Sequence, residues 1–190
     1  MKKPKLVRID LDKPITELVS KSDHKTLGIW AADCAERVLP YFEEKYPEDN
    51  RPRKAIEALR MWVQTGVFKM ADIRRDSLAA HAAAREVKEN NEACFSARAA
   101  GQAVATAHVP QHAFGAAYYA LKVVAAANSA NADIKIAKEL HWQSRRLPKN
   151  LRQDWQSKRL PKHLRSIMKR RHTLKRFKSK STLFEWFDKS

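Results

Sequence analysis

Glycine, cysteine and long apolar stretches are scarce in this sequence. Only 4 of its 190 residues are Gly, which excludes glycine-rich phosphate loops and a dinucleotide-binding fingerprint. No stretch approaches the roughly 18 uncharged apolar residues of a membrane span. After Met-Lys-Lys, the residues Pro4, Lys5, Arg8 and Asp10 stand where a signal peptide would have its apolar segment. We therefore expect a soluble, cytoplasmic protein.

The two cysteines and the acidic residues give no sign of a catalytic centre. Cys34 and Cys94 stand 60 residues apart among alanines, without the spacing of a metal site. Buried, reduced thiols are therefore expected. A Gly-x-Ser-x-Gly elbow is absent, and none of the 21 acidic residues stands out as one of a catalytic pair. The sequence favours a protein without enzymatic activity and without a cofactor.

Acidic residues become rare toward the C-terminus. Residues 1–137 carry 21 basic and 17 acidic residues, whereas residues 138–190 carry 17 and 4, within a net charge of +17. The first part is nearly neutral and the last is a polycation. We expect an N-terminal arm at 1–22, a helical bundle domain at 23–137 and a basic C-terminal extension at 138–190.

Apolar periodicity predicts a series of helices. Apolar residues recur every three or four positions from Leu27 to Phe42, after Asp23, a favourable N-cap. Pro52 suits the first turn of the next helix and Gly66 suits its end. Helices are predicted at about 24–45, 52–66, 69–88, 91–108 and 112–128.

Alanine dominates residues 79–127. It has the highest helix propensity and little bulk, so alanine-rich helices can approach one another closely. Val and Ile are scarce and no long alternating run suggests a strand. We predict an all-α fold, an alanine-rich multi-helix bundle with a short-helical basic C-terminal extension.

A short segment is duplicated in the C-terminal part. Residues 142–152 (WQSRRLPKNLR) and 155–165 (WQSKRLPKHLR) are identical at nine of eleven positions, with a period of 13. Two copies are too few for a stacked repeat array. Pro148 and Pro161 are each expected to open a short helix.

Histidines suggest a metal site, although the pattern is weak. His81, His108 and His112 could bind a metal together with Asp33 or Asp76, which makes a metal-dependent enzyme the third hypothesis. Pro110 disfavours a continuous helical turn through the last two histidines. Polar or interface histidines are therefore favoured.

One arginine stands in a helix that is otherwise almost apolar. Arg98 is expected to be partly buried, where a guanidinium needs a carboxylate partner. The candidate partners are Asp33, Glu36 and Asp76.

Basic residues and aromatic rings alternate beyond residue 141. Such a surface displaces counterions from phosphates and binds polyanions in a salt-dependent manner. It would equally bind acidic proteins or anionic lipid. The polyanion-binding candidates are Arg145, Arg146, Lys149, Arg152, Lys158, Arg159, Lys162, Arg165, Lys169, Arg170, Arg171, Lys175 and Arg176.

Several segments of the first two thirds are characteristic of one bacterial family. They are residues 32–43 (ADCAERVLPYFE), 49–58 (DNRPRKAIEA), 79–85 (AAHAAAR), 101–109 (GQAVATAHV) and 112–120 (HAFGAAYYA). Over about residues 23–128 the chain resembles the Imm-5-like immunity proteins of polymorphic toxin systems, and the first Trp-Gln-Ser segment resembles the family's closing piece. The duplication and the tail from Lys169 onward depart from it.

The resemblance implies a non-catalytic binder that occludes a cognate bacterial toxin through a preformed helical face. The partner-binding candidates in the matching segments are Asp33, Glu36, Arg37, Arg53, His81, Arg98, His108, His112 and Tyr118. A nucleic-acid-binding protein that uses residues 142–180 is the alternative.

Overall fold

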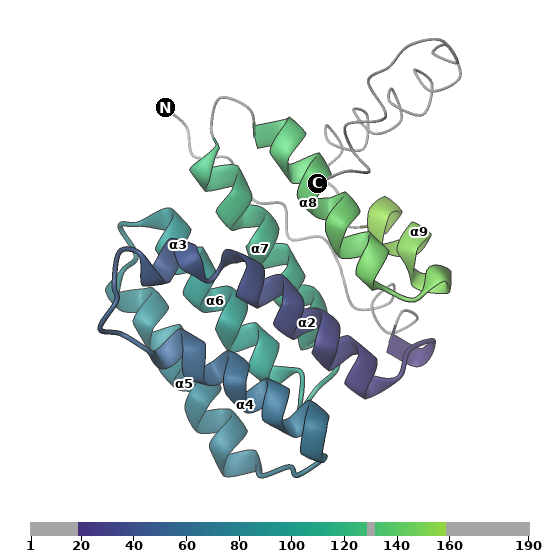
Figure 1. The fold of residues 1–190 in the computed structure, drawn as a ribbon, viewed down its shortest axis with the longest axis horizontal. Coiled ribbons are helices and arrows are strands. Elements are labelled where there is room, and N and C mark those ends of the chain that lie inside the picture. Colours follow the sequence, from purple (N-terminus) through teal and green to yellow (C-terminus); the bar gives the residue numbers. More distant parts are fainter. Residues whose placement is uncertain (1–18, 129–131, 159–190) are drawn as a thin grey trace.

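The structure is a computed structural model that describes residues 19–128 and 132–158. Within these ranges the chain is helical and contains no strand, which confirms the all-α prediction (Figure 1). The helices are α2 (His24–Val38), α3 (Pro40–Glu43), α4 (Arg51–Thr65), α5 (Met70–Glu86), α6 (Asn91–Ala105), α7 (His112–Ala127), α8 (Ala132–Arg146) and α9 (Lys149–Lys158).

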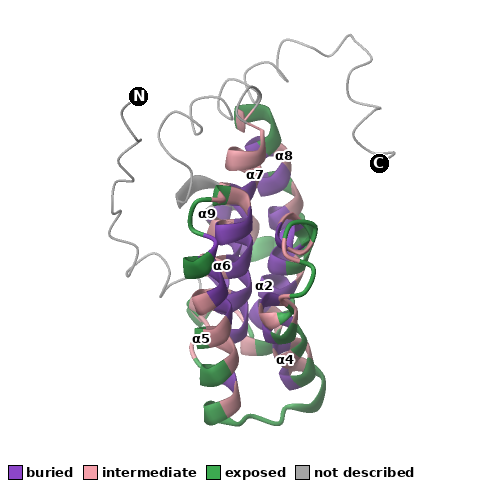
Figure 2. Cartoon of the chain, turned by 90° about the vertical axis from the view of Figure 1, so that its left-hand side faces the viewer, coloured by how far each residue is buried: buried purple, intermediate pink, exposed green. Residues whose placement is uncertain are grey.

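The helices pack around α6. Helices α5, α6 and α7 contact each other in sequence and form one layer, while α2 and α4 cover α6 from the other side (Figure 1). Helix α8 packs against α7, and α9 packs against α8. Buried residues lie between the layers and exposed residues on the outside (Figure 2).

Local signals explain where most helices begin and end. The Asp23 carboxylate accepts a hydrogen bond from the Thr26 N–H at 2.8 Å, which confirms the N-cap and lowers the pKa of Asp23. Gly66 ends α4 with a left-handed φ of 72°. The single helix predicted at 24–45 is wrong, because α2 ends at Val38 and Pro40, which has no N–H to donate, opens the separate α3.

Small residues allow the helices to approach closely. A Cβ added to Gly28 on α2 would lie 2.8 Å from the Trp62 ring of α4, so only glycine fits without a shift there. The buried positions of α6 and α7 are mainly alanine. The fully buried alanines of these two helices are Ala93, Ala97, Ala99, Ala100, Ala103, Ala113, Ala116, Ala117 and Ala120.

Three aromatic rings join distant parts of the chain inside the core. Trp30 of α2, Phe114 of α7 and Trp155 of α9 are fully buried, with ring centroids 5.2 to 5.6 Å apart. The Trp30 indole N–H donates to the carbonyl of Gln143 at 2.9 Å. The second half of the chain thus completes the core. The basic extension was expected to begin at residue 138, which lies in the middle of α8. Helix α8 has buried residues both before and after this position.

Both cysteines are buried and free, which confirms the expectation for them. Burial raises the pKa of the Cys34 thiol well above its usual value. These thiols therefore behave as small apolar groups of the core.

Candidate functional site

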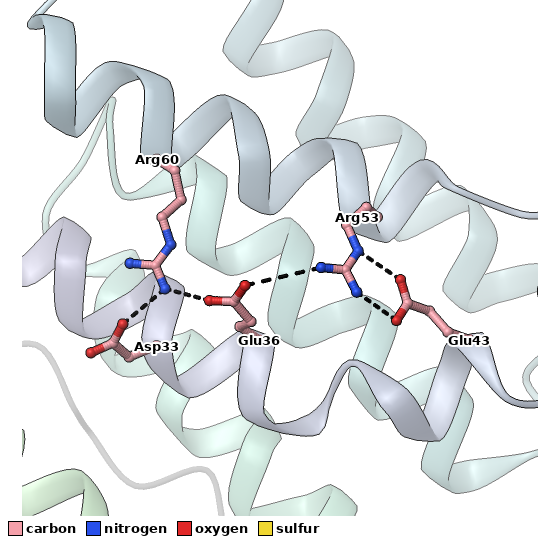
Figure 3. Close-up of polar contacts among 5 residues, drawn as sticks. All are labelled: Asp33, Glu36, Glu43, Arg53 and Arg60. Atoms are coloured by element: carbon pink, nitrogen blue, oxygen red, sulfur yellow. Dashed lines mark hydrogen bonds and ion pairs between the residues drawn. The ribbon is translucent and has the colours of Figure 1, made fainter.

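A row of ion pairs joins α4 to α2 and α3 (Figure 3). Arg60 donates to Asp33 at 2.9 Å and also pairs with Glu36. Arg53 binds both oxygens of Glu43 at 2.7 Å and lies 4.0 Å from Glu36. We call this network, with its extension to α8 described next, the ion-pair seam.

The ion-pair seam continues onto α8. Arg37 of α2 donates to Glu139 at 2.7 Å, and the Glu139 side chain is only 4% exposed. Arg146 pairs with Asp33 at 3.3 Å. The Trp142 ring lies between the two guanidinium groups, 4.3 Å from Arg37 and 3.9 Å from Arg146. The first copy of the duplicated segment is therefore attached to α2 through cation–π contacts and charge.

The seam brings four of the predicted binding residues together but neutralises them within the chain. Asp33, Glu36, Arg37 and Arg53 each pair with another residue of the same protein. Apart from the pair with the buried Glu139, these ion pairs are partly exposed and contribute about 0–1 kcal/mol each. Their arrangement stabilises the contact between helices and leaves no net charge of one sign for a partner.

The ion pair predicted for Arg98 is wrong. Its three candidate partners form ion pairs with other arginines. Arg60 pairs with Asp33 and Glu36, and Arg75 pairs with Asp76 at 2.9 Å. Arg98 is half-buried on α6 and makes no ion pair with a carboxylate in the described part of the chain. Its guanidinium lies 6.0 Å from the centre of the Tyr119 ring.

Arg98 has a cationic neighbour on α7. The Lys122 ammonium lies 4.0 Å from the centre of the Phe95 ring and 5.4 Å and 5.9 Å from those of Tyr119 and Tyr118. Partial burial lowers the pKa of Lys122, and the charge of Arg98 lowers it further. We call these five residues of α6 and α7 the cationic face.

Polar side chains extend this surface toward α5. His81 lies against Gly101, where an added Cβ would be 2.9 Å from the imidazole, and the Gln102 amide oxygen is 2.8 Å from His112 Nδ1. Desolvation lowers the pKa of His81 and of His112, and Arg98 adds to the effect at His81. Both imidazoles therefore favour the neutral form.

The metal hypothesis finds no support in this geometry. In residues 19–128 and 132–158 no three His, Cys, Asp or Glu side chains converge in a way that could hold a metal ion. His112 is hydrogen-bonded to Gln102, and His108 is exposed beyond the end of α6.

The cationic face lies in a part of the sequence without acidic residues. The one acidic residue of α6, Glu92 in its first turn, lies 3.6 Å from Lys45. Residues 93–127 include Arg98 and Lys122 but contain no Asp or Glu. Sequence reasoning selected Arg98 and Tyr118 here and missed Phe95, Tyr119 and Lys122. The gap in acidic residues was the signal that could have identified them. We take the cationic face as the candidate binding site.

Comparison with protein-family models assigns the chain to a family. The model of the family described as Imm-5 like putative immunity protein matches residues 17–150. The chain belongs to this family. The Imm-5 like match covers α2 to α8 and includes both the ion-pair seam and the cationic face. No curated protein and no solved structure matches the chain.

Of the polyanion-binding candidates, Arg145, Arg146 and Lys149 lie inside the Imm-5 like match and the others follow it. In the described part, Arg146 is bound within the seam, and Arg152 donates to the carbonyls of Leu147 and Arg145 at 2.9 and 3.0 Å. Arg145 and Lys149 are exposed. The side chains of the remaining candidates lie outside the described residues: Lys158, Arg159, Lys162, Arg165, Lys169, Arg170, Arg171, Lys175 and Arg176.

The described helices also include none that is long and apolar enough to span a bilayer.

Proposed function

We propose that this chain is an immunity protein that binds a cognate toxin and blocks its action by occlusion, without catalysis of its own. Membership of the Imm-5 like family supports a role of this general kind. The observation that carries the proposal is the cationic face, where Arg98 and Lys122 lie beside aromatic rings and lack a paired carboxylate among the described residues.

The residue types on this face suit a protein interface. Tyr and Arg are enriched among the side chains that dominate binding energy, particularly where they are rigidly held. Tyr118 and Tyr119 are half-buried on α7, and their rings lie 6.0 Å apart. Their positions are set by a helix packed into the bundle, which favours recognition by a preformed surface.

Co-expression tests the proposal. A toxin domain, where one is encoded beside this chain, is induced in a host with and without the chain, and growth is followed. We expect growth to be restored in proportion to the amount of the chain. The toxin should be recovered in a 1:1 complex with its mass unchanged, after nuclease treatment and in high salt.

Two outcomes would contradict the proposal. If the chain does not restore growth, it is not the immunity protein of this toxin. If protection is complete far below a 1:1 ratio, or if the toxin is recovered in altered form, the chain acts catalytically. A complex that disappears with nuclease would instead favour the nucleic-acid hypothesis.

A further inference from the structure

Most arginines that the structure places in ionic contacts have a carboxylate within hydrogen-bond distance. Arg37, Arg51, Arg53, Arg60, Arg75 and Arg146 all belong to this set. Arg98 differs from them, because it makes no ion pair with a carboxylate among the described residues and its neighbours include the Cys94 thiol and the Tyr119 ring. Its nearest charged neighbour on the face is another cation, Lys122.

This pairing of two cations is unfavourable in the isolated protein. Both side chains lie near the Tyr119 ring, with Arg98 at 6.0 Å and Lys122 at 5.4 Å from its centre, so their like charges repel each other. Burial lowers the pKa of Lys122, and the charge of Arg98 lowers it further. Cation–π contacts with Phe95 and Tyr119 offset only part of the cost. A carboxylate placed between the two cations would gain two charge-assisted hydrogen bonds and remove the repulsion.

We propose that the cationic face binds an acidic patch of the partner protein, with a carboxylate side chain held between Arg98 and Lys122. The proposal rests on the proposed function and specifies the chemistry of the toxin surface. It predicts that the toxin presents Asp or Glu at its contact with α6 and α7.

The ring contacts favour protein carboxylates over nucleic acid. Single-stranded nucleic acids are bound by positive grooves together with free aromatic faces on which the bases stack. Here a cation already lies against the rings, with the Lys122 ammonium 4.0 Å from the Phe95 centre and Arg98 6.0 Å from that of Tyr119. The rings hold the two cations in place, and the cations are available for an ion pair with a carboxylate of the partner.

Residue-resolved NMR on the full chain tests this chemistry directly. The probes are an octaglutamate peptide and octathymidylate, each titrated into isotope-labelled protein. Because signals are followed one residue at a time, binding to the basic C-terminal part is read separately from binding to the cationic face. We expect octaglutamate to shift the amide signals around Arg98 and Lys122.

Two double variants make the comparison specific. We expect R98A/K122A to weaken the shifts on the cationic face about tenfold or more. K25A/K69A removes the same charge from exposed sites outside this face and should leave them unchanged. R98K/K122R keeps the charge and should retain binding. Far-UV circular dichroism and thermal unfolding verify that each variant is folded.

The inference is overturned if R98A/K122A retains the octaglutamate shifts. It is also overturned if octathymidylate shifts the face and octaglutamate does not. The growth assay separates this failure from that of the proposed function. Protection by the wild type and equally by R98E/K122E would contradict the acidic-patch inference alone, whereas a wild type that does not protect contradicts the proposed function.

Discussion

Arg60 and Arg98 are half-buried arginines on helices that contact each other, yet their surroundings differ. Arg60 on α4 faces α2, which offers Asp33 and Glu36. Arg98 on α6 faces outward, beside α7, which offers tyrosines and a lysine. Whether a cation belongs to the scaffold or to a binding surface thus depends on the residues that the neighbouring helix presents.

The lowered pKa of His81 makes a prediction about acid sensitivity. A histidine whose folded pKa is lowered stabilises the protein fully above its unfolded pKa of about 6.5 and loses that contribution as the pH falls. We expect His81→Gln to lose less free energy of unfolding than the wild type between about pH 7.5 and about pH 5. Urea unfolding followed by circular dichroism measures this difference.

Exposed Gln64 provides the control, because Gln64→Ala changes no titratable group and should show the same acid loss as the wild type. An equal loss in His81→Gln and the wild type would mean that this imidazole is not destabilised by protonation in the folded state.

Gly28 sets the distance between α2 and α4. Alanine there would gain about 1 kcal/mol of helix propensity. Its Cβ, however, would meet the Trp62 ring at 2.8 Å and Val63 at 3.1 Å, and overpacking typically costs about 1–3 kcal/mol. We expect Gly28→Ala to lower the melting temperature, while Lys25→Ala, an exposed change in the same helix, leaves it nearly unchanged. A more stable Gly28→Ala protein would show that the two helices can move apart freely.

At the scale of the elements, two copies of one segment occupy different environments. Trp142 of α8 is stacked at the surface between Arg37 and Arg146. Trp155, at the equivalent position of the second copy, lies on α9 and is fully buried against Trp30. The same tryptophan position of the duplicated segment therefore makes a surface contact in one copy and belongs to the core in the other.

This difference predicts unequal effects of the same substitution. Trp155→Ala removes a buried indole and should cost about 3–5 kcal/mol of unfolding free energy. Trp142→Ala removes two cation–π contacts and the packing of a half-buried ring against the core, and should cost less, about 2 kcal/mol. Chemical denaturation of both variants measures the two losses. Equal losses would contradict the assignment of the two copies to surface and core.

Helices were predictable because their signals are local. The apolar period after Asp23, the Pro52 start and the Gly66 stop all act within a few residues, and the structure has helix boundaries close to each. Pairing between helices was not predictable in this way. Asp33 and Arg60 are 27 positions apart, and which of the many possible carboxylates meets Arg60 depends on how α2 and α4 are rotated.

The candidate site shows the same limit. Arg98 was singled out by its apolar surroundings, but a buried ion pair was predicted for it. The actual neighbour, Lys122, lies 24 positions away and looks ordinary in the sequence. The nine-of-eleven identity of the duplicated segments likewise gave no means of telling that Trp142 stays at the surface and Trp155 enters the core.

For the whole molecule, the core extends well into the basic part of the sequence. Leu140, Leu147, Leu151 and Trp155 are buried with the same cluster as Trp30. We expect a chain that ends at Lys158 to keep a cooperative thermal transition, since these residues are retained. A chain that ends at Lys135 loses all four and should unfold at a much lower temperature. Scanning calorimetry of the two truncated chains compares them, and equal stabilities would contradict this account of the core.

The packing of the alanine-rich helices α6 and α7 into the core also affects the entropy of binding. It fixes the backbones that carry Arg98 and Lys122, and the rings of Phe95 and Tyr119 restrict the two long side chains in the free protein. Immobilising such a side chain at an interface normally costs about 0.5–1.5 kcal/mol. Part of this conformational freedom is already lost when the protein folds. Binding to an acidic surface, even a small one, would therefore carry a reduced entropic cost for ordering these two side chains.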